Sequence, residues 1–111
     1  MNLKELRNKL EQCWDKKTSF SRTEGSRGQC YVTALLISKL YDCEIMHGHV
    51  IFNGIKEHHF WNSIHNLEID LTSDQYGGDG INPITTGKWY GRANFKNRRF
   101  LILEKRFECL Q

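Results

Sequence analysis

The sequence lacks any long apolar run. Its N-terminus reads Met1-Asn2-Leu3-Lys4-Glu5-Leu6-Arg7, and charged side chains interrupt each apolar stretch there. A signal peptide needs an apolar core of about 7–15 residues, and a membrane helix needs about 20, so neither is predicted. We therefore expect a soluble, cytoplasmic protein that starts where it is written and has no membrane partner.

Cysteines are few, and the net charge is small. The four cysteines, at positions 13, 30, 43 and 109, could form two disulfides, but nothing indicates secretion and 111 residues can fold without them. We expect free thiols in a reducing compartment. The net charge of +3 is too mild to identify a partner. No internal repeat or low-complexity tract occurs, and residues 1–111 suit a single domain.

Helical spacing of apolar residues appears in three segments. Residues 3–15 predict an amphipathic helix with Asn2 as N-cap and Glu5 as its reciprocal partner. Residues 29–41 predict a second helix. The segment Ser26-Arg27-Gly28-Gln29 matches a capping box at its start, so Cys30 is expected in the first turn. The spacing of Phe100, Leu103, Phe107 and Leu110 predicts a C-terminal helix, although residues 100–103 could also form a strand.

Three β-prone runs follow the second helix. They cover residues 44–52, 55–64 and 67–72, and Asn53-Gly54 and His65-Asn66 separate them. Asn-Gly readily takes the positive φ angles of a two-residue hairpin turn, so the runs predict three consecutive antiparallel strands. Residues 16–27 and 77–96 predict a surface loop and irregular structure. The fold class is α+β, with helices at both ends and the helix that carries Cys30 packed on an antiparallel sheet.

Cys30 is the candidate nucleophile. A reactive cysteine must be ionised near neutral pH, and the unpaired N–H groups of a helix N-terminus stabilise a thiolate. It also needs a base within hydrogen-bond reach and an acceptor that orients the base. If Ile64 and Leu67 flank the turn, His59 pairs with Thr72. Asp70 is then the diagonal neighbour of His59, at a distance that the side chains of His59 and Asp70 can bridge.

The residues that carry this arrangement also carry a family resemblance. In chain order they are Trp14 with Thr18-Ser19, Gly28-Gln29-Cys30-Tyr31-Val32-Thr33-Ala34-Leu35, His59-Phe60-Trp61-Asn62, and Glu68-Ile69-Asp70-Leu71-Thr72 with Asp74-Gln75. In order and spacing the sequence resembles the YunG-like family and, more distantly, the transglutaminase-like and papain-like superfamily. The resemblance implies a papain/transglutaminase-like fold whose helix-borne Cys, His strand and Asp strand correspond to Cys30, His59 and Asp70. Asp42-Cys43 stands where a glycine pair is expected after the helix.

The expected reaction is acyl transfer on a peptide, amide or thioester substrate, by hydrolysis, deamidation or transamidation. Cys30 would attack the carbonyl, His59 would move the proton, and the backbone N–H of Cys30 would be one oxyanion donor. Gln29, Trp14 and Ser19 are candidates for the second donor. No cofactor is expected. The alternative is a non-catalytic binding module on the same fold.

Several residues have competing interpretations. His58 is the rival base, but adjacent strand residues face opposite sides, so only one of His58 and His59 can face Cys30. Trp61 shares the face of His59 and either shields the imidazole or is an ordinary core aromatic. We expect Cys13 and Cys43 to be buried residues that fill apolar space.

Two binding alternatives remain. Cys43, His47, His49 and His58 are suitable zinc ligands, but their spacing fits no strong zinc signature, so we expect no metal. Between Lys88 and Arg106, seven Lys or Arg residues and one Glu are interleaved with aromatics, a composition that can bind nucleic acid. No recognised reading motif accompanies it, and we do not expect a nucleic-acid partner.

Overall fold

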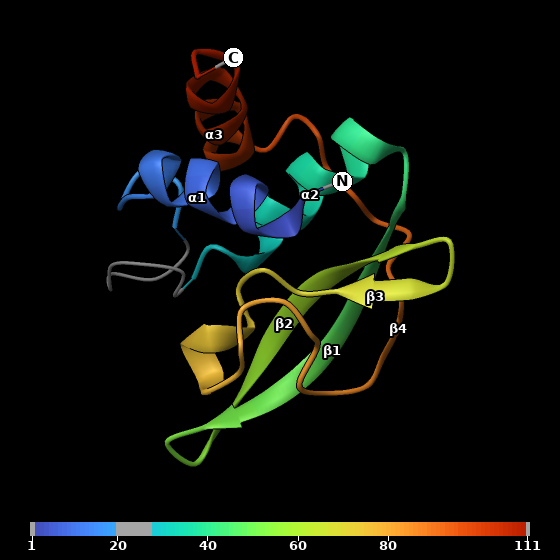
Figure 1. The fold of residues 1–111 in the computed structure, drawn as a ribbon. Helices are drawn as coiled ribbons and strands as arrows, with labels where there is room; N and C mark the ends of the chain where they lie inside the picture. Colours follow the sequence, from blue (N-terminus) through green and yellow to red (C-terminus); the bar gives the residue numbers. More distant parts are fainter. Residues whose placement is uncertain (1, 20–27, 111) are drawn as a thin grey trace.

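Three helices lie over one side of an antiparallel sheet in the computed structural model (Figure 1). The structure describes residues 2–19 and 28–110. The helices are α1 (Leu3–Cys13), α2 (Cys30–Tyr41) and α3 (Arg98–Glu108). The strands are β1 (Glu44–Phe52), β2 (Ile55–Ile64), β3 (Leu67–Ile69) and β4 (Gly87–Trp89), in the order β3-β2-β1-β4, and a 3₁₀ turn, η1, spans Ser73–Tyr76. The chain is therefore an α+β protein, as predicted.

The first helix begins as predicted and ends two residues early. The Asn2 side chain accepts a hydrogen bond from the backbone N–H of Glu5 at 3.0 Å, which satisfies one of the unpaired N–H groups of the first turn. Trp14 leaves the helix with an extended backbone, and its indole N–H donates to the hydroxyl of Thr33 on α2. The helix therefore stops where the indole turns inward.

The predicted capping box before α2 is wrong. Gly28 has a φ of 73°, a conformation that glycine adopts without steric cost, and the helix starts two residues later at Cys30. The Gln29 side chain bonds elsewhere and does not cap the helix, and Ser26 lies outside the described residues. At the other end, Asp42 takes the left-handed conformation that ends many helices, with a φ of 48°.

The two hairpin turns are confirmed. Asn53 and Gly54, and then His65 and Asn66, all have positive φ angles, and the register pairs Phe52 with Ile55 and Ile64 with Leu67. The third strand ends at Ile69 rather than Thr72, because the backbone N–H of Asp70 turns away to donate to the carbonyl of Ile81.

The C-terminal part of the chain contains a strand that the sequence did not predict. The strand β4 lies within the segment predicted to be irregular, where it pairs with β1. All three of its residues are exposed, so no alternation of apolar and polar residues marks it. The segment from Phe100 to Leu103 belongs to α3, which Asn97 caps by accepting from the N–H of Phe100, so its interpretation as a strand is wrong.

The main hydrophobic core lies where the helices meet one another and the sheet. The core residues include Leu6, Leu10 and Cys13 of α1, Leu35 and Leu36 of α2, Phe100, Leu103 and Phe107 of α3, and Ile45 and Ile69 of the sheet. Cys13 is 2% exposed and fills this core, as predicted. Among the described residues, no helix is both long enough and apolar enough to cross a membrane.

Candidate active site

Cys30 is the first residue of α2. Gln29 precedes it as N-cap, and the backbone carbonyl of Gln29 accepts the first helical hydrogen bond, from the N–H of Thr33. The N–H groups of a first helical turn have no acceptor within the helix. Cys30 is only 9% exposed, yet it lines a surface pocket. Its thiol therefore lies beside N–H donors and can be reached from that pocket.

Gln29 fixes the chain that leads into this helix. Its side chain is fully buried, its carbonyl oxygen accepts from the Thr18 hydroxyl at 2.7 Å, and its amide donates to the backbone carbonyl of Asp15 at 3.0 Å. Both ends of the amide are therefore bonded within the protein. Gln29 holds Cys30 in place but directs no donor toward a substrate.

His59 is buried completely in β2 and bonds to Asp70. The His59 Nε2 and an Asp70 carboxylate oxygen are 2.6 Å apart, and both side chains are at most 1% exposed. The register of the β2–β3 hairpin is the predicted one. When the same register is counted one residue beyond the end of β3, Asp70 lies diagonally across from His59. Since Asp70 occupies Nε2, Nδ1 is the ring nitrogen left for Cys30.

The charge state of His59 follows from its neighbours. Burial alone would lower the pKa of the ring, but hydrogen bonds with the side chains of Asp70 and Cys30 outweigh burial and raise the pKa to about 9. The ring therefore holds a proton at neutral pH. A protonated imidazole between a carboxylate and a thiol is the arrangement that a cysteine nucleophile requires.

Asp70 is held from the side opposite the histidine. Its second carboxylate oxygen accepts from both the backbone N–H and the hydroxyl of Thr72, each at 3.2 Å. The carboxylate therefore orients the imidazole and also caps the turn that follows β3. Asp74 lies farther along this turn, and its carboxylate binds the guanidinium of Arg7.

Aromatic rings enclose His59. Trp61 is 1% exposed and stacks on the imidazole with the ring centres 5.8 Å apart, while Tyr76 presents its edge at 5.1 Å. The indole N–H of Trp61 donates to Glu68 at 2.7 Å. Trp61 is therefore buried against the imidazole, a position compatible with the shielding role that is one of its two sequence interpretations.

The other two predicted donors, Trp14 and Ser19, make described contacts elsewhere in the fold. The indole N–H of Trp14 is bonded to Thr33, so it is not free for a substrate. Ser19 is buried, and its backbone carbonyl accepts from the guanidinium of Arg99. Neither contact directs a donor at Cys30.

Gln75 is the residue that sequence reasoning missed. Its amide nitrogen lies 3.3 Å from Nδ1 of His59, and its carbonyl oxygen accepts from the N–H of Gly28 at 2.9 Å. It connects η1 to the segment that carries Cys30. The only signal was its place in the resembling motif Asp74-Gln75, because no periodicity marks a side chain that acts from a turn.

A pocket of about 760 Å³ opens beside Cys30. This volume lies within the range of about 300–1,000 Å³ that is usual for small-molecule sites. Its aromatic lining includes Tyr31, Phe60, Tyr76 and Tyr90. Polar groups in the wall include Arg92 and Glu57. The pocket can therefore take a partly apolar ligand up to the thiol.

A comparison with protein families assigns the chain to a family. The family model described as "YunG protein" matches residues 2–111. The chain belongs to the YunG family. No curated protein and no solved structure matches it. The match to the YunG family spans nearly the whole chain and therefore includes Cys30, His59, Asp70 and Gln75.

His58 lies on the opposite face of β2 from His59, although it also lines the pocket beside Cys30. In the YunG-family chain it forms a cross-strand pair with His49 on β1, and its Nδ1 lies 2.8 Å from Nε2 of His47. Burial and then the neighbouring His58 and His49 lower the pKa of His47, and burial, Lys56 and His58 lower the pKa of His49. Cys43, the fourth member of the zinc alternative, bonds instead to Ile37 and Asn62.

The basic C-terminal segment is partly engaged within the fold. Arg99 donates to the carbonyl of Ser19, and Arg106 donates to the carbonyl of Cys13 and pairs with Asp15 at 2.8 Å. These contacts join α3 to the end of α1 and to the segment that follows it. Two of the seven basic residues therefore have a structural role, and we propose no nucleic-acid surface.

Proposed function

We propose that this YunG-family protein is a cysteine-nucleophile acyl-transfer enzyme with a papain/transglutaminase-like fold. Cys30, His59 and Asp70 form its catalytic triad. The observation that carries the proposal is the fully buried His59, whose Nε2 is 2.6 Å from Asp70 and whose raised pKa has the Cys30 side chain as one of its causes. Few structural roles require a protonated imidazole buried between a carboxylate and a thiol.

The reaction follows the usual two steps. The Cys30 sulfur attacks the carbonyl carbon of an amide or thioester, and the carbonyl electron pair moves to oxygen. His59 gives its Nδ1 proton to the leaving amine or thiol as the carbon–nitrogen or carbon–sulfur bond breaks, which leaves an acyl thioester on Cys30. The ring then takes a proton from water or an amine as that nucleophile attacks, which releases the acyl product and restores the thiolate and imidazolium.

Two donors would stabilise the tetrahedral oxyanion. The first is the backbone N–H of Cys30, at the start of α2. The second is the amide of Gln75, which lies 3.3 Å from Nδ1 of His59 and makes a long 3.4 Å contact with the Thr72 hydroxyl, so that its other N–H would serve the oxyanion. This assignment replaces Gln29, whose amide is bonded to Asp15.

The substrate class follows from the pocket. Its aromatic wall and its few charged groups favour an acyl group with apolar character, presented as a peptide amide or a thioester. All four cysteines are free in the structure, which supports a reducing, cytoplasmic location.

Brief labelling with iodoacetamide at neutral pH tests the proposal. Cys30 should label fastest although Cys109 is the more exposed thiol, because His59 and the helix N-terminus activate Cys30. Peptide mapping identifies the labelled residue, and Cys109→Ser and Cys30→Ser serve as controls. A short incubation with an activated ester such as p-nitrophenyl acetate should acylate Cys30 as well. If Cys109 labels first and no acyl adduct forms, the protein is a binding module and the proposal is wrong.

A further inference from the structure

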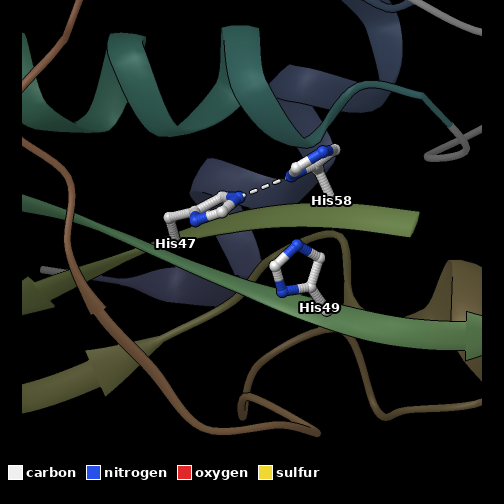
Figure 2. Close-up of side chains that lie close together, drawn as sticks. All are labelled: His47, His49 and His58. Carbon is white, nitrogen blue, oxygen red and sulfur yellow. Dashed lines mark hydrogen bonds between the residues drawn. The ribbon is translucent and has the colours of Figure 1, made fainter. Parts of the chain in front are cut away.

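Three histidine side chains gather on one face of the β1–β2 pair (Figure 2). His59 is not among them, because it lies on the other face of β2. His49 is directly opposite His58, and His47 is two residues before His49, so all three share one face of the sheet. One ring nitrogen from each lies within 4.8 Å of the others. His47 and His49 are neighbours along β1, and the hairpin brings His58 of β2 to them.

The rings are already close to a metal-binding geometry. Zinc binds imidazole nitrogen at about 2.0–2.1 Å, so two ligands of a tetrahedral ion lie about 3.3 Å apart. His47 Nε2 and His58 Nδ1 are 2.8 Å apart, slightly closer than that. One of these nitrogens must present a lone pair to the other, since a hydrogen bond needs one acceptor. Small side-chain rotations would let an ion take the place of the shared proton.

The surroundings orient two of the three residues. The ring of His47 packs against Phe60, with centres 4.9 Å apart, and against Tyr90, at 5.8 Å. The backbone of His49 is held by Thr85, whose hydroxyl donates to its carbonyl at 2.9 Å. The side chain of His49 is exposed, so its ring can turn toward the other two. The ring of His47 is held by packing, and the exposed rings of His49 and His58 can adjust to close around an ion.

We propose that His47, His49 and His58 form a binding site for a zinc-type divalent ion. Three imidazoles suit zinc, nickel and copper, whereas magnesium and calcium prefer oxygen ligands. Among the described residues, the cluster contains no fourth His, Cys, Asp or Glu ligand. The fourth position is therefore left to water or to a ligand in the pocket, which His47 and His58 line together with Cys30. The proposal does not depend on catalysis by Cys30.

Zinc titration of tag-free, chelator-stripped protein at neutral pH tests the site. With a chromophoric chelator as competitor, we expect one zinc per chain in the wild type. His49→Ala and His47→Ala should each weaken binding roughly tenfold or more, since the loss of even an outer-shell partner costs about 10–100-fold. The matched control is His65→Ala, which removes an exposed histidine from the β2–β3 turn. Circular dichroism melts check that each variant is folded.

Three further measurements make the test decisive. Cys30→Ser should keep wild-type zinc affinity, which separates this site from metal capture by the thiol. Magnesium should not compete with zinc. Ring nitrogen resonances of His47, His49 and His58 should shift on zinc addition, and those of His65 should not. Unchanged affinity in His49→Ala, or loss of binding in Cys30→Ser, would overturn the proposal.

Discussion

At the scale of single residues, the candidate site is built around one buried imidazole with a partner at each ring nitrogen. Asp70 accepts from Nε2 of His59, and the side chain of Cys30 is the hydrogen-bond partner of Nδ1, beside the amide of Gln75. Buried polar atoms are nearly always hydrogen-bonded, because an unpaired one loses its solvation without compensation. The ring is therefore oriented before any substrate arrives, and its protonation is the property to measure.

The raised pKa predicts that His59 carries a proton at neutral pH. The ring should keep this proton until the pH rises through about 9. Any stability that the charged ring contributes is fully present below its ordinary value of 6.5 and is lost above about 9. In ¹⁵N-histidine NMR titrations, one ring should titrate near 9 and disappear in His59→Gln, while His47 and His49 titrate below 6.5. Titration of His59 at or below 6.5 would contradict this prediction.

Asp70→Asn should keep the fold and lose most of the reactivity of Cys30. The Asn carbonyl can still accept from Thr72, but its NH₂ would face Nε2 of His59 and favour the tautomer with its proton on Nδ1. That neutral ring stabilises a thiolate poorly. In a well-characterised serine triad the corresponding change lowers turnover by about 10⁴, and a preformed ion pair depends less on its acid.

The measurement compares alkylation rate with melting temperature, and the matched control is Asp74→Asn. Asp74→Asn keeps an oxygen that can accept from Arg7, and Arg7 keeps its bond to the Leu71 carbonyl, so this variant should alkylate near the wild-type rate. If only Asp74→Asn lost reactivity, the orienting acid would be Asp74. If Asp70→Asn kept its alkylation rate, Asp70 would serve only as a turn cap.

At the scale of elements, the sheet depends on two glycines that lie under one aromatic ring. Gly48 of β1 pairs with Gly87 of β4, and the ring of Trp61 lies against both. A Cβ on Gly48 would come within 2.6 Å of the Thr86 carbonyl and 2.8 Å of the indole. Close approach of backbone and indole is therefore what allows β4 to join the sheet.

Gly87→Ala should destabilise the protein by about 1–3 kcal/mol, as overpacking usually does. Its Cβ would meet the Trp61 ring at 2.5 Å and would also collide with the backbone carbonyl of His47, which cannot move without shifting β1. Gly91→Ala is the control, since the three atoms nearest to its Cβ all belong to the ring of Trp89, which is 68% exposed and can rotate away. Urea unfolding measures the free energy of unfolding of both variants. Equal losses in the two variants would refute the packing argument.

At the scale of the whole molecule, one guanidinium joins the first helix to the segment beyond the sheet. Arg7 of α1 donates to the carbonyl of Leu71 and makes two hydrogen bonds with Asp74, and it lies over the ring of Trp14. Its side chain is 17% exposed. The linked segment runs from Asp70 to Gln75, so this contact positions two residues of the proposed active site.

Arg7→Gln should therefore lower both stability and reactivity. We expect a loss of about 1–3 kcal/mol in the free energy of unfolding, because hydrogen bonds to charged groups contribute that much, and slower alkylation of Cys30. The control is Lys9→Gln, which removes only the Lys9–Glu5 pair on α1, at 3.7 Å, and should cost less than about 0.5 kcal/mol. Chemical denaturation measures the stability of each variant, and the labelling rate measures the reactivity of Cys30. A variant with lower stability but unchanged labelling would limit Arg7 to a structural role.

The local features of this protein were predictable from its sequence. Helical periodicity located α1, α2 and α3, and Asn53-Gly54 located a hairpin turn, because capping, side-chain spacing and positive φ angles act within a few residues. The hairpin register followed from the turns, and with it the approach of His59 to Asp70. Alternation along a strand placed His58 on the opposite face from His59.

Only the tertiary structure decided the rest. The amide of Gln29 is committed to Thr18 and Asp15, Gln75 reaches His59 from a turn, and β4 joins the sheet through glycines under Trp61. Each of these contacts joins residues that are distant in the sequence or lie in segments without periodicity. Packing of the whole chain determines them, because the free energy of such a contact depends on elements that the local sequence does not contain.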